Sequence, residues 1–269
     1  MQVNGVQLSR RERLRAETVR DIKEIALRHM ADSGAAALSL RAIAREMGMT
    51  AGALYSYYDT RDDLITALIV DIYTGLASAL QAARLSRPGD PLGQLVAVGV
   101  TYREWAVAHP TEFQLVYGDP LPGYQVPEDG AELAAEHRAC GVLIKIVADA
   151  WPAAPGTRPA AAGLEVPEYR WSDFRPDFAA MARDTFPGLP PGAAALSLRV
   201  WGRLHGLVAL EVYGHLRPQV NDPARLYRDE LRDLCALLAS WLPAASAAPA
   251  APRPAAPEAS AAPEASAAG

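Results

Sequence analysis

The hydrophobic positions of this chain recur mostly with helical spacing. Ile22, Ile25, Ala26 and Met30 fall on one helix face before Gly34, which is well placed to end a helix. A second helix should be capped by Asp59 or Thr60. In it, Leu64, Leu68 and Ile72 repeat every fourth position. The pattern therefore predicts an all-α fold that begins with a helix over residues 9–33.

Gly and Pro divide the rest of the chain into further helical blocks. The long helix that follows residue 60 should end before residues 87–90. Other helices are predicted over residues 40–47, 51–57, 92–108, 110–117, 128–150, 191–216 and 223–242. Residues 152–170 are expected to form a loop, and a short helix is expected within residues 173–186.

The composition supports this division and adds a tail. Half of the 269 residues are hydrophobic and 7% are aromatic, with few β-branched runs, which favours helices over strands. Residues 244–269 contain little besides Ala, Pro, Ser and Glu, so they cannot form a packed core. We expect a head at 1–64, a body at 65–243 and a disordered tail at 244–269.

Residues 40–58 have the spacing of a helix-turn-helix, the paired-helix motif that reads DNA. Ala44 is small where two helices would cross, Gly48 can adopt a positive φ in the turn, and Leu54 reaches the core six residues later. Thr50 is placed to cap the second helix. The N-terminal half of that helix should therefore enter the major groove.

The candidate DNA contacts fall into two groups. The small side chains of Ala51 and Ala53 let the helix backbone approach base edges and offer methyl contacts to thymine. Hydroxyl and guanidinium groups are expected to bind phosphates. These phosphate-binding candidates are Arg41, Thr50, Tyr55, Tyr57 and Arg61. Tyr58 is expected to point inward.

Charge is distributed unevenly along the chain. The formal net charge is −5, but residues 1–64 carry 10 Lys and Arg against 9 Asp and Glu, whereas residues 65–269 carry 16 against 22. Five arginines lie within the first 20 residues. A basic N-terminal arm could meet phosphate, although the same residues could form a solvated helix face.

The segment T-A-G-A-L-Y-S-Y-Y-D-T-R-D-D-L, residues 50–64, closely resembles the segment that marks the TetR family of bacterial repressors. Two positions depart mildly from the family pattern: Tyr58 stands where Phe is usual, and Arg61 where Lys is usual. The resemblance covers residues 10–70. It implies a three-helix DNA-binding head and a larger helical body that binds a small molecule and dimerises, with no cofactor.

A second resemblance concerns the body. The run W-G-R-L-H-G-L, residues 201–207, looks like the signature of one TetR C-terminal subclass, and so does His109-Pro110 followed by two aromatic residues. The candidate ligand contacts are Trp105, Phe113, Tyr117, Trp201 and His205. For any one of the aromatic residues, ordinary core packing is the simpler interpretation, and for His205 it is a packed, hydrogen-bonded histidine.

Other classes of protein have weaker support. Cys140 and Cys235 lack metal or disulfide spacing, and the five histidines form no pair at metal spacing, so no metal site is predicted. Common catalytic motifs are missing, which disfavours an enzyme. An architectural DNA-binding protein without a sensor remains a second alternative. No signal stretch or run of about 18 apolar residues appears, which predicts a cytoplasmic protein without membrane contact.

The resemblance also suggests a mechanism. The last two helices would pair with those of a second copy, forming a homodimer whose recognition helices lie about 34 to 36 Å apart. The partner would be double-stranded DNA with a near-palindromic operator. An unknown small-molecule effector would tilt the long fourth helix and release the DNA.

Overall fold

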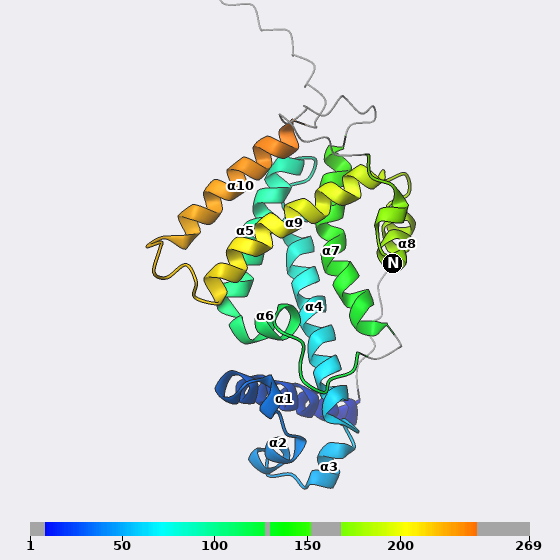
Figure 1. Ribbon diagram of the computed structural model, residues 1–269. Helices are drawn as coiled ribbons and strands as arrows, with labels where there is room; N and C mark the ends of the chain where they lie inside the picture. Colours follow the sequence, from blue (N-terminus) through cyan, green and yellow to red (C-terminus); the bar gives the residue numbers. More distant parts are fainter. Residues whose placement is uncertain (1–8, 127–129, 152–167, 241–269) are drawn as a thin grey trace, which may run out of the picture.

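The computed structural model describes residues 9–126, 130–151 and 168–240, whose regular secondary structure is helical, without a strand. Three helices form a compact head at one end, and the long helix α4 rises from it into the body (Figure 1). The head helices and α4 are α1 (Arg10–Ser33), α2 (Leu40–Glu46), α3 (Ala51–Tyr55) and α4 (Arg61–Leu85). The all-α prediction is confirmed.

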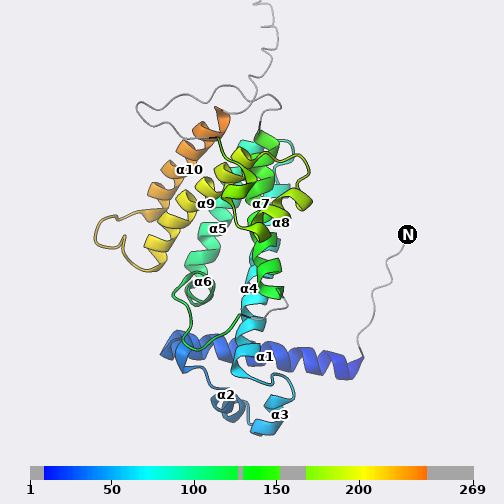
Figure 2. The same ribbon diagram turned by 45° about the vertical axis from the view of Figure 1, so that its right-hand side comes forward.

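The body surrounds the upper part of α4. Its helices are α5 (Pro91–Ala108), α6 (Pro110–Tyr117), α7 (Ala131–Ala150), α8 (Pro176–Thr185), α9 (Pro191–Val212) and α10 (Pro223–Ala239). Helix α4 packs against α5 and α7, while α9 crosses α5 and α7 and is joined by α10 (Figures 1 and 2). Short 3₁₀ helices lie at Ala35–Ala37 and Trp171–Asp173.

Local caps explain where the head helices begin. Ser9 and Glu12 form a reciprocal capping box at α1, and Thr60 and Asp63 form another at α4. The Thr50 hydroxyl accepts a hydrogen bond from the Ala53 amide at 3.2 Å, as expected for the N-cap of α3. These caps satisfy backbone amides that have no partner inside their own helix.

Two hydrophobic cores are built on α4. Leu64 and Leu68 are buried in the head core, and Leu76 and Leu80 are buried in the body core. Because one helix contributes to both cores, a shift of α4 in the body should also move the head residues that pack against α4. The boundary predicted at residue 64 falls in the first turn of this helix.

Some sequence predictions need correction. Ile72 is only half-buried, because 3.6 residues per turn move the buried stripe to Tyr73. Helix α3 ends at Tyr55, not at residue 57. Helix α9 ends at Val212, not at residue 216, because the chain turns at Gly214, whose φ is 79°. Helix α10 ends at Ala239, not residue 242.

Two predictions lie largely outside the described residues: most of the 152–170 loop, and the whole tail at 244–269. The predicted start of α7 at residue 128 also falls in an undescribed segment, and the helix begins at Ala131. The short helix expected within residues 173–186 is α8.

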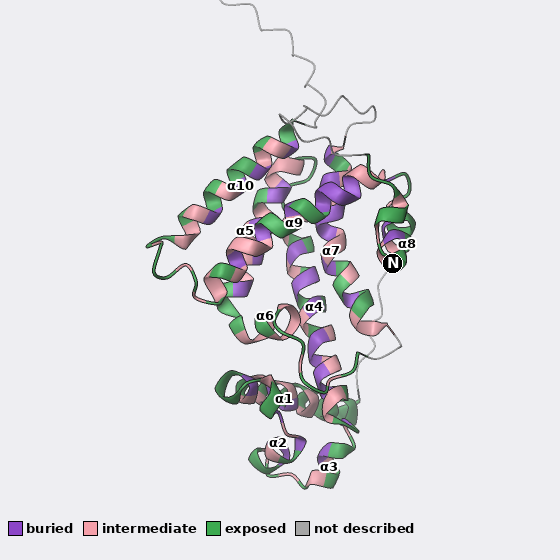
Figure 3. Ribbon diagram, in the orientation of Figure 1, coloured by how far each residue is buried: buried purple, intermediate pink, exposed green. Residues whose placement is uncertain are grey.

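Helix α4 is long and apolar enough to cross a membrane, judged by length and composition alone. Its apolar side chains instead serve the interior of this fold, since they lie in both cores (Figure 3). We therefore interpret it as a core helix.

Candidate nucleic-acid interface

The turn between α2 and α3 has the geometry that the residue spacing predicted. Ala44 is 2% exposed where the two helices meet, and Leu54 is fully buried. Gly48 has φ of 66°, a left-handed conformation that suits glycine, and the Met49 amide donates to the Ala44 carbonyl at 2.8 Å. Tyr58 is buried, as expected, and burial raises the pKa of its hydroxyl to about 12.

Most candidate DNA contacts share the outer surface of this motif. Thr50, Tyr55 and Arg41 are exposed. Ala51, Ala53 and Tyr57 are partly exposed. Tyr57 follows the end of α3 in the turn toward α4, so its direction is set by that turn and by its neighbours rather than by the helix.

Arg61 has a role that the sequence did not predict. Its guanidinium donates to the Ala35 carbonyl at 3.0 Å and contacts Asp62 at 3.4 Å. The side chain therefore connects the first turn of α4 to the 3₁₀ helix after α1. Its Nε atom is buried and has no hydrogen-bond partner among the described residues.

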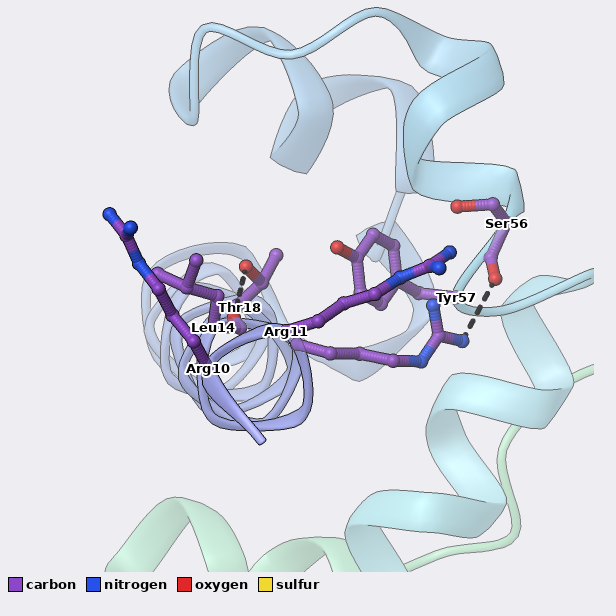
Figure 4. Close-up of a pocket in the computed structure, with 7 residues that line it drawn as sticks. Arg10, Arg11, Leu14, Thr18, Ser56 and Tyr57 are labelled. Atoms are coloured by element: carbon purple, nitrogen blue, oxygen red, sulfur yellow. Dashed lines mark hydrogen bonds between the residues drawn. The ribbon is translucent and has the colours of Figure 1, made fainter. Parts of the chain in front are cut away.

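A basic hollow of about 840 Å³ lies between the start of α1 and the turn after α3. Arg10, Arg11 and Arg15 line it together with Tyr57, and no acidic residue does. Figure 4 shows Arg11 directed toward Tyr57, whereas Arg10 points to the opposite side of α1. Tertiary structure thus brings the basic N-terminal residues against the helix-turn-helix.

Arg15 contacts the turn after α3 directly. Its Nη2 donates to the Ser56 carbonyl at 3.2 Å, and its guanidinium carbon lies 4.6 Å from the centroid of the Tyr57 ring. A cation over an aromatic face is attracted by the ring quadrupole. Arg15 therefore positions Tyr57, a role that residue spacing gave no means to find.

A polar cluster ties the other end of α1 to α2. Glu46 of α2 accepts hydrogen bonds from Arg28 Nη2 and His29 Nε2, each at 2.6 Å. The hydrogen bond from His29, followed by that from Arg28, lowers the pKa of the Glu46 carboxyl. The helix-turn-helix is thus held against α1 on two sides.

The five candidate ligand residues come together in one aromatic cluster in the body. Tyr117 lies 4.9 Å from His205 and 5.6 Å from Trp201 between ring centroids, and Phe113 stacks on His205 at 5.5 Å. Trp105 joins through Phe113 at 6.5 Å. The residues come from α5, α6 and α9, so the fold assembles side chains that lie up to 100 positions apart in the sequence.

Sequence reasoning missed Tyr102, which lies at the centre of this cluster. Its hydroxyl is 2.8 Å from His205 Nδ1, and its ring is 5.1 Å from that of Trp201. Its position three residues before Trp105 on a helix was the available signal. Burial lowers the pKa of His205 and raises that of Tyr102, so both side chains favour their neutral forms.

The cluster continues into the head. Tyr117 meets Tyr73 of α4 edge to face with ring centroids 5.9 Å apart, and the Tyr73 hydroxyl donates to the Val116 carbonyl at 3.2 Å. Val116 and Tyr117 pack against the head core. A continuous set of contacts therefore joins His205 to α4.

Comparison with known proteins agrees with this geometry. Residues 22–68 match the family model described as bacterial regulatory proteins, tetR family, and residues 95–234 match the tetracyclin repressor-like C-terminal domain. HTH-type transcriptional regulators of Mycobacterium tuberculosis and Mycobacterium bovis are 33% identical over 244 residues, which cover 87% of this chain and 96% of theirs.

Solved structures have the same fold. A regulatory protein, SCO4313, is 33% identical with a TM-score of 0.65, and the match covers 84% of this chain and 98% of that one. A tetR-family regulatory protein from Rhodococcus RHA1 matches over 82% and 97% of the two chains at 15% identity, with a TM-score of 0.53, and so supports the fold alone. The chain is a DNA-binding transcriptional regulator, not an enzyme, and belongs to the TetR family.

Proposed function

We propose that the protein is a ligand-responsive repressor that binds a near-palindromic operator as a homodimer. The proposal rests on the continuous contacts that run from the aromatic cluster through Tyr117 and Tyr73 to α4. Helix α4 in turn contributes to the hydrophobic core of the head. Because its proposed target is DNA, we place the protein in the cytoplasm.

The proposed DNA contacts follow from exposure and chemistry. Ala51 and Ala53 approach base edges, while the hydroxyls of Thr50, Tyr55 and Tyr57 bind phosphates. Arg41 and Arg61 provide further phosphate contacts, Arg61 from beside the Ala35 carbonyl that it already holds. With two alanines facing the bases, DNA shape and half-site spacing supply much of the discrimination.

The proposed dimer interface lies on α9 and α10. Leu198 and Leu210 are 44% and 42% exposed on α9, and Tyr213 is exposed just beyond its end. A Cβ added at Gly202 or Gly206 would meet no atom within 4 Å, so a second helix can approach this face closely. Exposed apolar side chains beside small residues suit association with an identical surface.

The proposed effector contacts are Trp105, Phe113, Tyr117, Trp201 and His205. A small molecule that displaces Phe113, Trp201 or His205, whose rings contact Tyr117, would move Tyr117 and, through Tyr73, shift α4. Helix movement then alters the separation of the two recognition helices. Coupling of about 1–3 kcal/mol is typical of such regulation.

The DNA proposal is tested by the double variant Tyr55→Ala with Arg61→Ala. Fluorescence anisotropy should show weaker binding both to operator DNA and to DNA of other sequences. The affinity should also depend less steeply on salt concentration. Unfolding of the single variant Arg61→Ala in the absence of DNA measures what its hydrogen bond to the Ala35 carbonyl contributes to stability. The phosphate contact does not affect this measurement, because no DNA is present. Unchanged affinity and salt slope in the double variant would contradict the proposed contacts.

The dimer proposal is tested by sedimentation of the full chain at micromolar concentration. Wild type should sediment as a dimer, and Gly202→Glu should sediment as a monomer because it buries a charge in the interface. Arg87→Glu, on the exposed turn between α4 and α5, is the control and should remain dimeric. A monomeric wild type would contradict the interface.

A further inference from the structure

An open groove of about 540 Å³ lies between α4, α7 and α8. Helix α7 lies between the other two and contacts both (Figure 1). None of the residues that line the groove belongs to the aromatic cluster, which is built from α5, α6 and α9. The volume is within the range of small-molecule sites, about 300–1,000 Å³.

Every formally charged side chain that lines the groove is cationic. These residues are Arg84 of α4 with Arg138 and Lys145 of α7, in a chain whose net charge is −5. Arg84 lies near the C-terminus of its helix, where the helix dipole already favours a cation. Arg138 and Lys145 lie within α7, two turns apart on one face, so the dipole does not explain them.

The existing partners leave this charge largely unbalanced. Arg138 donates to the neutral Thr74 hydroxyl at 3.2 Å, and Arg84 Nε donates to the Gln81 amide oxygen at 3.2 Å. Lys145 pairs with Asp149, one turn further along α7 and outside the groove lining. The groove therefore offers cationic donors that favour an anion.

The remaining lining is apolar. Val142 is 5% exposed, and Met181 and Phe186 are partly buried and pack against the body core. Gly141 adds no side chain to this surface, and a Cβ there would lie 3.8 Å from the Phe186 ring. A hydrocarbon body can therefore lie on these side chains while a charged group reaches the arginines and Lys145.

We propose that this groove binds an amphipathic organic anion, of the class of medium-chain carboxylates. It is a second ligand site, separate from the effector contacts proposed above. The bound anion joins Arg84 of α4 to Arg138 and Lys145 of α7, and so holds α4 against α7. Since α4 carries the head, the anion also changes operator affinity.

Calorimetric titration of the full wild-type chain with hexanoate, octanoate and decanoate, each below its micelle concentration, tests the ligand class. Affinity should rise about fourfold for each added methylene that becomes buried. Decanamide is the matched uncharged probe and should bind at least tenfold more weakly than decanoate. Failure of decanoate to bind, or equal binding of decanamide, overturns the proposal.

Variants test the location. Arg138→Gln with Lys145→Gln should weaken decanoate binding at least tenfold, whereas Arg87→Gln removes the same kind of charge outside the groove and should leave it unchanged. Circular dichroism checks folding, and the single Lys145→Gln, which alters only a partly exposed side chain, serves if the double variant unfolds. Equal weakening by Arg87→Gln would mean nonspecific attraction and overturn the site.

A third variant separates this site from the aromatic cluster. Trp201→Leu alters the aromatic cluster alone and should leave decanoate binding intact. Loss of decanoate binding in Trp201→Leu, with no loss in the groove variants, would place the anion in the cluster and overturn the second site. Failure of the groove therefore leaves the proposed repressor function untouched.

Discussion

The guanidinium of Arg15 lies over the ring of Tyr57, 4.6 Å from its centroid, and joins the start of α1 to the helix-turn-helix. The same guanidinium donates to the Ser56 carbonyl. Two contacts from one side chain thus define the direction of a tyrosine that follows α3 and is proposed to bind phosphate. The first prediction tests this relationship.

Arg15→Gln should weaken operator binding by about 1–2 kcal/mol, because it removes a cation near the DNA and frees the Tyr57 ring. Anisotropy titrations over a range of salt concentrations should also show a smaller salt slope. Arg20→Gln is the matched control, since Arg20 is an exposed α1 arginine outside the basic hollow. An equal effect of both variants would show that only total charge matters.

Tyr57→Phe and Tyr57→Leu separate the hydroxyl from the ring. Phe retains the surface under Arg15 and loses only one phosphate hydrogen bond, so it should cost about 1 kcal/mol of operator affinity. Leu loses both and should cost more. Equal affinities for these two variants would indicate that the cation–π contact does not position this residue.

Gly48→Ala should destabilise the head although a Cβ would have open space there. At φ of 66° the strain lies in the backbone, and the expected cost is about 1–2 kcal/mol. Gly52→Ala within α3 is the control and should be neutral or stabilising by about 0.5–1 kcal/mol. Urea denaturation without DNA measures both, and an unaffected Gly48→Ala would contradict the requirement for glycine.

Gly99→Ala tests the contact between α5 and α10. The added Cβ would lie 2.4 Å from Leu231 Cδ2, and Leu231 is only 2% exposed, so overpacking should cost about 1–3 kcal/mol. Leu231→Ala alone should cost about 2–5 kcal/mol through a cavity. In the double variant the new methyl group has room, so the combined loss should be smaller than the sum of the two.

The pH dependence of unfolding should include a contribution from His205. Burial lowers its pKa below the unfolded value near 6.5, so the unfolded chain takes up the proton first as pH falls. Its contribution to stability is complete above pH 6.5 and is lost below it, with a slope of at most about 1.4 kcal/mol per pH unit. His205→Asn should flatten the profile between pH 7 and 5 relative to wild type, and parallel profiles would contradict this assignment.

The sequence by itself determined the local elements of this protein. Ser9, Thr50 and Thr60 act on amides no more than three residues away, so their capping roles could be predicted from spacing alone. The same holds for the turn at Gly48, whose conformation depends on its own backbone. The helix-turn-helix and the family could be recognised because their signals lie within about 25 residues.

Only the tertiary structure decided which distant residues meet. Arg15 reaches a turn 41 residues away, Arg61 turns to the Ala35 carbonyl, and Tyr102 contacts His205 across 103 positions. Such contacts depend on how helices cross after the chain returns, and on competition among partners for the same polar groups. Periodicity identifies a buried helix face but does not name the side chain opposite it, which is why the groove between α4, α7 and α8 was found only in the fold.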